Sequence, residues 1–172
     1  MPAPAAELLI DGFGRIKESV HQVLDGLPHE ALVWRPDADA NSAGWLLWHL
    51  TRVQDAQIAP LAGAPEVWTE DGWVERFALP YPASTHGYGA SSADVGAFDA
   101  SAELLAGYYD ATHARTEAYL AGLDDDAYAE VVDAHWNPPV TAGVRIVSIL
   151  DDDARHIGQA EYVRGQWERS AR

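Results

Sequence analysis

The sequence predicts an all-α fold, a bundle of four helices that forms a single domain over residues 1–172. Four segments carry apolar residues at the three- and four-residue spacing of a helix that buries one face, and no segments show convincing strand pairing. The chain is also 48% hydrophobic, which is enough at 172 residues to bury one sizeable core. These observations together favour a helical bundle.

The first predicted helix runs from Ala5 to about Gly26. Pro28 and the stretch 35–40, which contains proline and aspartate, then predict a connection. The apolar residues of this helix recur every three or four positions, and they are Leu8, Leu9, Phe13, Ile16, Val20, Val23, Leu24 and Leu27.

The second predicted helix covers about 43–62, and Asn41 or Ser42 can cap it by accepting hydrogen bonds from its first free amides. Residues 63–97 follow, rich in glycine and proline and without a sustained period. This segment is too long for an ordinary connection, and its aromatic residues argue against disorder. We therefore expect a long ordered loop that covers the bundle. Its aromatic residues are Trp68, Trp73, Phe77, Tyr81 and Tyr88.

The third predicted helix runs from about Phe98 to Leu120. An acidic connection and the helix-breaking sequence Asn137-Pro138-Pro139 come next. Thr141 can cap a fourth helix, which is expected to continue to about Gly165.

Candidate metal ligands lie on the second and fourth predicted helices. On a wheel of 100° per residue, His49 lies near the centre of an apolar arc, so its imidazole faces the core and needs a polar partner. A hydrogen bond from a neutral histidine to a carbonyl would also meet that need. Asp152 and His156, however, are four residues apart, and side chains at this spacing converge on one ion. The sequence therefore predicts a metal site at His49, Asp152 and His156.

Two neighbours leave the details of this site open. The acidic run 151–153 spans about 200° of the helix, so at least one of its carboxylates must approach the interior. Asp153, three residues before His156, is therefore a rival to Asp152 as the carboxylate ligand. Gln159 follows His156 by three residues and can orient a ligand or bond a substrate.

Further polar residues are weaker candidates for a functional role. Arg52 and Arg164 are candidates to bind an anionic cofactor or substrate, or else to pair with neighbouring acids. His135 and His86 lie in predicted connections, where a histidine is more often exposed than catalytic.

Composition limits the partners and the metal. The 27 acidic residues outnumber the 11 basic ones, and the net charge of -16 repels nucleic acid and anionic lipid. No apolar run approaches the roughly 20 residues that cross a bilayer, and the N-terminus does not resemble a signal peptide, so we expect a cytoplasmic protein. Cysteine is absent, so nitrogen and oxygen must bind the metal: zinc is expected first, with nickel, iron or manganese as alternatives.

Two segments of the chain also resemble a known family. They read NSAGWLLWHLTRVQD at 41–55 and DDARHIGQAEYVRG at 152–165, and they are similar to the DinB/YfiT-like superfamily, in the branch of mycothiol-dependent maleylpyruvate isomerase and mycothiol S-transferases. The resemblance implies an up-down four-helix bundle, often dimeric, with a metal held by three residues of the second and fourth helices. His49 matches the first of these and His156 the last. Asp152 stands where the isomerase branch has glutamate and many other members have histidine.

The resemblance also implies a chemistry. It implies a low-molecular-weight thiol as co-substrate, mycothiol in an actinobacterial source, which attacks a small electrophile. Two imidazoles and one carboxylate leave coordination positions open for such a ligand, as catalytic sites do. We expect a homodimeric, metal-dependent enzyme, either a thiol S-transferase or an isomerase-like enzyme that uses the thiol transiently, with His49, Asp152, His156 and Gln159 at its catalytic site. The alternatives are a non-catalytic dimeric metal-binding or stress-response module and a metal-dependent hydrolase.

Overall fold

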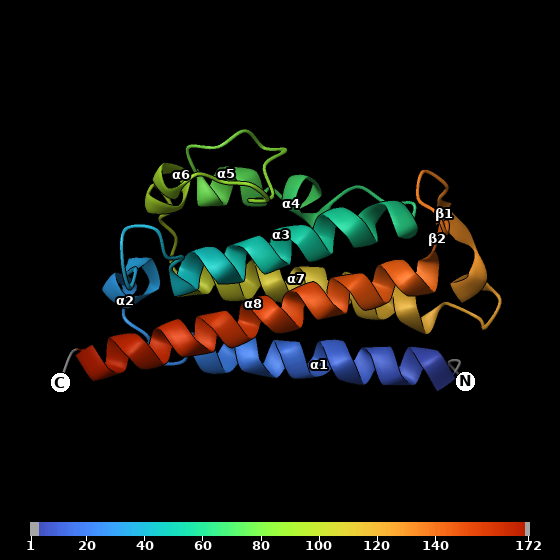
Figure 1. Ribbon diagram of the computed structural model, residues 1–172, viewed down its shortest axis with the longest axis horizontal. Coiled ribbons are helices and arrows are strands. Elements are labelled where there is room, and N and C mark those ends of the chain that lie inside the picture. The colour runs from blue at the N-terminus through green and yellow to red at the C-terminus, as the bar shows by residue number, and fades with distance from the viewer. Residues whose placement is uncertain (1–3, 171–172) are drawn as a thin grey trace.

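The computed structural model describes residues 4–170 and confirms the all-α fold (Figure 1). No helix within this range combines the length and the apolar character needed to cross a membrane. The bundle consists of the long helices α1 (Pro4–Leu24), α3 (Ala43–Leu61), α7 (Ala102–Ala121) and α8 (Ala142–Ser170). Shorter elements are α2 (His29–Val33), α4 (Val67–Glu70), α5 (Trp73–Phe77), α6 (Ser92–Gly96) and a 3-10 turn at Ala127–Ala129.

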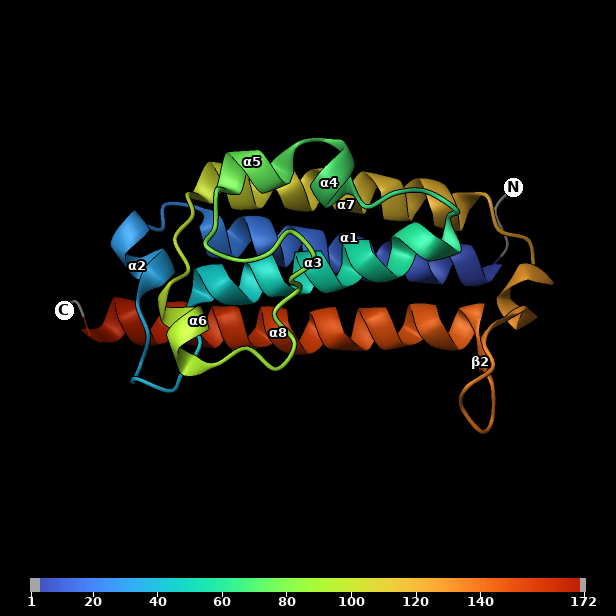
Figure 2. The same cartoon turned by 90° about the horizontal axis from the view of Figure 1, so that it is seen from above.

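The long helices lie side by side in two layers. Seen from above, α7 and α8 lie on opposite sides, with α3 between them and α1 beneath (Figure 2). Helices α3 and α8 run antiparallel, whereas α3 and α7 run in the same direction, because the segment 62–101 returns the chain to the end at which α3 begins (Figure 1). Successive long helices therefore alternate in direction except for α3 and α7, which the segment 62–101 connects. The interface between α3 and α8 is the most extensive helix contact of the described chain.

Side-chain caps mark the starts of the two helices that carry the predicted metal ligands. The Oγ atom of Ser42 accepts a hydrogen bond of 3.2 Å from the backbone amide of Trp45, at the start of α3. Thr141 Oγ1 lies 3.4 Å from the amide of Val144 in the first turn of α8. Both caps satisfy amides that have no partner within the helix. The predicted starts of these helices are thus confirmed.

Two predicted helix ends are wrong. Helix α1 ends at Leu24 rather than at Gly26, whose φ of 64° is a left-handed conformation that ends a helix. Helix α8 continues past Gly165 to Ser170, although its last turn is polar and leaves the apolar period unclear.

The chain forms a small hairpin before α8 that the sequence did not predict. Strands β1 (Val131–Asp133) and β2 (Val140–Thr141) pair antiparallel, with Val131 opposite Thr141 and Asp133 opposite Val140. Strands of two or three residues are too short to show an alternating pattern. The hairpin leads the chain directly into the first turn of α8.

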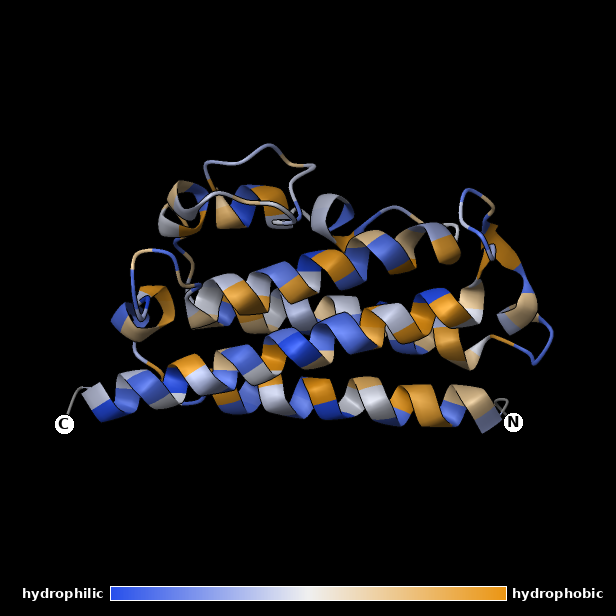
Figure 3. Ribbon diagram, in the orientation of Figure 1, coloured by the Kyte–Doolittle hydropathy of each residue, from blue (hydrophilic) through white to orange (hydrophobic). Residues whose placement is uncertain are grey.

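The segment 63–97, which we call the covering segment, lies over α3 and α7 and folds into α4, α5 and α6 rather than into a continuous loop (Figure 1). Most of its large apolar residues are buried against the bundle, although Tyr88 is exposed, and apolar and polar residues alternate along the long helices (Figure 3). Trp68 packs edge-on against Trp48 of α3 and lies 5.1 Å from the ring of Tyr108 of α7. Aromatic packing therefore orders this segment, as its composition predicts.

Two buried charged residues of α3 fasten the covering segment to the bundle. Asp55 accepts hydrogen bonds of 2.9 and 2.8 Å from the backbone amides of Val67 and Trp68 at the start of α4. Arg52, which is 1% exposed, donates to Glu66 at 2.8 Å and to the carbonyl of Thr85 at 3.1 Å. These bonds hold both ends of the stretch 66–85 against α3.

Candidate metal centre

His49 lies on the face of α3 that meets α8 and is only 8% exposed. Its Nδ1 lies 2.5 Å from the backbone carbonyl of His86 in the covering segment. A carbonyl can only accept, so Nδ1 carries the proton and Nε2 keeps its lone pair. Burial also lowers the pKa of His49, which favours the neutral imidazole. The side chain is therefore held in the tautomer and charge state of a metal ligand.

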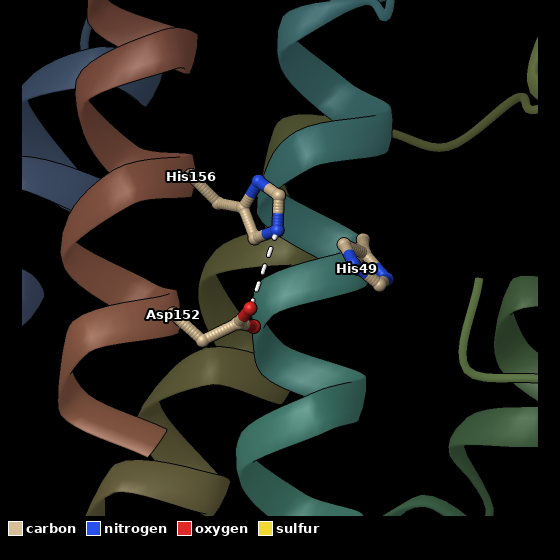
Figure 4. A group of neighbouring side chains, drawn as sticks. All are labelled: His49, Asp152 and His156. Atoms are coloured by element: carbon tan, nitrogen blue, oxygen red, sulfur yellow. Dashed lines mark ion pairs between the residues drawn. The ribbon is translucent and has the colours of Figure 1, made fainter. Parts of the chain in front are cut away.

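Asp152 and His156 approach His49 from α8 (Figure 4). Being one helical turn apart, they project side by side: Asp152 Oδ1 lies 3.6 Å from His156 Nε2. The rings of His156 and His49 meet edge to face, with centroids 4.8 Å apart. Gln159 Oε1 lies 2.8 Å from His156 Nδ1, so Nδ1–H donates a hydrogen bond to the amide oxygen and Nε2 keeps its lone pair. Both imidazoles thus present an unprotonated Nε2.

These three side chains fit a divalent ion. One ligand atom from each lies within 4.8 Å of the others, and a set of two imidazoles and one carboxylate suits zinc and related ions. The other carboxylate oxygen of Asp152, Oδ2, is buried and has no hydrogen-bond partner among residues 4–170. A bound cation would satisfy this otherwise costly group. The hydrogen bonds at both Nδ1 atoms are the outer contacts that metal-binding histidines usually make.

Asp153 lies apart from this cluster. It is fully buried, and burial together with the neighbouring carboxylate of Asp152 raises the pKa of Asp153 well above its usual value. Neither of its oxygens has a hydrogen-bond partner within the described chain. The structure therefore places Asp152, and not Asp153, beside the two imidazoles.

A pocket of about 530 Å³ opens next to the cluster, between α3 and α8. This volume is in the range of small-molecule sites. On α8 the lining residues recur at 145, 148 and 152, which places them on the face that also carries His156. The pocket is lined by His49, Val53, Ala56 and Gln57 of α3, by Arg145, Ser148 and Asp152 of α8, and by His86 and Tyr88 of the covering segment.

Comparison with known proteins now identifies the family. A model of the DinB superfamily matches residues 13–160, which is most of the chain. The chain belongs to the DinB superfamily. A crystal structure of a conserved protein from Enterococcus faecalis is similar to this DinB protein, with a TM-score of 0.86 and 32% sequence identity over 92% of this chain and 94% of that one. No curated protein matches the chain.

Family membership agrees with the geometry of the site. The DinB superfamily is metal-binding, and the cluster of His49, Asp152 and His156 is a possible metal site in this member. The match is to the superfamily as a whole and not to its mycothiol-dependent branch.

The two predicted anion-binding arginines lie outside the pocket of this DinB protein. Arg52 is buried and donates to Glu66, Thr85 and Tyr108. Arg164 pairs with Glu168 at 2.8 Å and donates to the carbonyls of residues 22 and 23 on α1. The structure thus gives both arginines bonds within the fold, and their role toward a cofactor stays a prediction.

Sequence reasoning missed several residues of the pocket. Gln57, Arg145 and Ser148 received no role, although Arg145 and Ser148 precede Asp152 by seven and four residues and so share its helix face. That spacing was a usable signal. His86 is exposed, as expected for a loop histidine, but its carbonyl orients His49 and the residue lines the pocket. A contact made by a backbone carbonyl has no signature in the sequence. The other loop candidate, His135, is exposed and pairs with Asp133.

Proposed function

We propose that this DinB protein is a metal-dependent enzyme that joins a low-molecular-weight thiol to a small electrophile. One observation supports the proposal above others: the candidate ligands His49, Asp152 and His156 lie beside a pocket whose volume is in the range of small-molecule sites. A divalent ion bound by three protein ligands has open positions, where it lowers the pKa of a thiol or water.

The residues of the chain would supply the rest of the chemistry. His49 and His156 are held with Nε2 free by His86 and Gln159, which orients the ligand set before an ion arrives. The side chain of His86 lines the pocket and is a candidate to accept the proton that the thiol loses. The sulfur would then form a bond to the electrophilic carbon as the leaving group departs.

A hydrolase is the second candidate, because the same imidazole of His86 is a suitable general base for water. Water would then replace the thiol as the nucleophile. The identity of the thiol as mycothiol and the homodimer rest on the resemblance alone, and the cytoplasmic location rests on the sequence pattern alone.

The test compares turnover with and without thiol. Wild-type protein and the Asp152→Ala variant would be stripped with a chelator and reloaded with zinc, nickel, manganese or ferrous iron. The reactions would contain monochlorobimane with mycothiol or N-acetylcysteine, or p-nitrophenyl acetate without thiol. Conjugation that needs wild-type protein, metal and thiol supports the transferase. Ester cleavage without thiol supports the hydrolase. Stoichiometric metal without either activity would favour the non-catalytic module.

A further inference from the structure

The pocket beside the metal cluster has a single cationic side chain. Arg145 is the only arginine or lysine among the described residues that line it. Arg145 and Asp152 are seven residues apart on α8, which is nearly two turns, or about 10.5 Å along the axis. A molecule in the pocket therefore meets the metal ligands at one end and a guanidinium at the other.

Arg145 is a cation in a protein whose net charge is -16, and the position that it occupies on α8 is unusual for a cation. Arg145 lies close to the start of α8, where the helix dipole already contributes partial positive charge, and the first turn carries no acidic residue. A cation at this position works against the stability of the helix. Helix formation therefore does not explain why arginine occurs here. Its ion pair with Asp133 is one reason, and an anionic ligand in the pocket would be a second.

The guanidinium keeps donors free for such a ligand. Its two contacts are long: 3.3 Å from Nη1 to Gln57 Oε1 and 3.3 Å from Nη2 to Asp133 Oδ2. A guanidinium has five N–H donors, and the Arg145 side chain is 29% exposed. Asp133 accepts hydrogen bonds from His135 and does not line this pocket, whereas Arg145 lines both this pocket and the two neighbouring hollows that Asp133 lines. A ligand anion would therefore share Arg145 with Asp133.

We propose that Arg145 recognises a carboxylate on the substrate, so that the electrophile is a small carboxylic acid whose reactive carbon lies toward His49 and Asp152. This inference rests on the proposed function for the role of the metal end, but the anion site itself does not. A guanidinium that is only partly engaged by Asp133 suits a monoanion, and bidentate binding of carboxylates is the characteristic use of arginine. Val53 and Ala56 provide an apolar wall for the part of the molecule in between.

The test measures binding directly by isothermal titration calorimetry. The probe is 4-phenylbutyrate, and 4-phenylbutanamide is its uncharged match. Both would be titrated into metal-stripped and zinc-loaded wild type and into Arg145→Gln, Arg145→Lys and Asp133→Asn. Arg155→Gln is the matched control, because Arg155 lies on the same helix but pairs with Asp151 on the surface. Circular dichroism would check that each variant is folded.

The expected result is that the acid binds more tightly than the amide in both forms of the wild type. Arg145→Gln should weaken binding of the acid by about ten- to a hundredfold and leave binding of the amide unchanged. Arg145→Lys should retain part of the preference for the acid over the amide. Asp133→Asn should strengthen this preference, because it frees the guanidinium of Arg145. Arg155→Gln should bind both probes as the wild type does.

Two results would overturn the inference. One is equal affinity for acid and amide. The other is binding of the acid that needs zinc and is insensitive to Arg145→Gln, which would place the carboxylate on the ion. A protein that takes up no zinc but loses its preference for the acid in Arg145→Gln would contradict the proposed function and support the anion site.

Discussion

The backbone of Gly87 lies directly against the imidazole of His49. A methyl group built on Gly87 would meet Nδ1 of His49 at 2.6 Å and a ring carbon of Trp45 at 3.1 Å, and the φ angle of Gly87 is 93°. His49 is thus confined between Trp45, which stacks on it at a centroid distance of 6.4 Å, and the covering segment. The position of this candidate ligand depends on a residue without a side chain.

Gly87→Ala should therefore weaken metal binding by roughly tenfold or more, because the added methyl group displaces the imidazole. Gly89→Ala is the matched control: its φ is 72°, but no other described atom lies within 4 Å of the added carbon. Both variants carry a backbone penalty of about 1 kcal/mol. Competition with a fluorescent zinc chelator would measure the affinities. Equal affinities for the two variants would refute the steric role of Gly87.

Asp152→Asn and Asp153→Asn should differ in metal content. Asp152 belongs to the ligand cluster, whereas Asp153 is buried away from it. Replacing the carboxylate of the ligand cluster should lower zinc affinity at least about tenfold, and replacing the buried carboxyl of Asp153 should leave it unchanged. Inductively coupled plasma mass spectrometry of the two proteins would give the zinc content per chain. If Asp153→Asn lost the metal and Asp152→Asn kept it, the carboxylate ligand would be Asp153.

Gln159→Ala should reduce zinc affinity by about ten- to a hundredfold, the usual effect of removing a partner of a metal-binding histidine. The variant leaves Nδ1 of His156 without the acceptor that lies 2.8 Å away. Gln159→Glu keeps an acceptor and should retain binding. Gln166→Ala, on the same helix and outside the metal cluster, is the control. Competition with a fluorescent zinc chelator would measure the zinc affinities. An unchanged zinc affinity in Gln159→Ala would show that this hydrogen bond does not orient His156.

Arg52→Met should destabilise the protein by about 3 kcal/mol or more, because it leaves part of a buried polar network unpaired. Arg52 lies within 3.7 Å of Asp55 and bonds Glu66 and Thr85 of the covering segment. Arg15→Met removes an exposed ion pair with Asp11 and should leave the free energy of unfolding almost unchanged. Urea unfolding followed by tryptophan fluorescence would compare the two. If both variants lost a similarly small part of the free energy of unfolding, Arg52 would not hold the covering segment against α3.

Much of the fold follows from the helical period of the sequence. The starts of α3 and α8 were predicted because Ser42 and Thr141 combine a capping side chain with an apolar pattern that follows at once. The short helices of the covering segment have four or five residues each, too few for a period to show. Helices α3 and α7 run in the same direction because the covering segment spans the length of the bundle. Local sequence patterns do not specify the path of this segment.

Part of the candidate site could likewise be predicted from the sequence, and part could not. His49, Asp152 and His156 were identified from spacing alone, because the positions that face each other depend only on the period of the helix. The choice between Asp152 and Asp153 depends on the rotation of α8 against α3, a property of the packed bundle. The carbonyl of His86 reaches His49 from a segment 37 residues away, and any residue can supply a carbonyl.

The hydrogen bond between His49 and the carbonyl of His86 couples metal binding to the order of the covering segment, so that each affects the other. Opening the segment removes the acceptor that fixes the imidazole, so an open form would bind an ion less well. By thermodynamic linkage, an ion that favours the closed form suppresses opening by the same factor. Amide hydrogen exchange across residues 84–88 would therefore slow when metal is added, and the covering segment would report on the state of the centre beneath it.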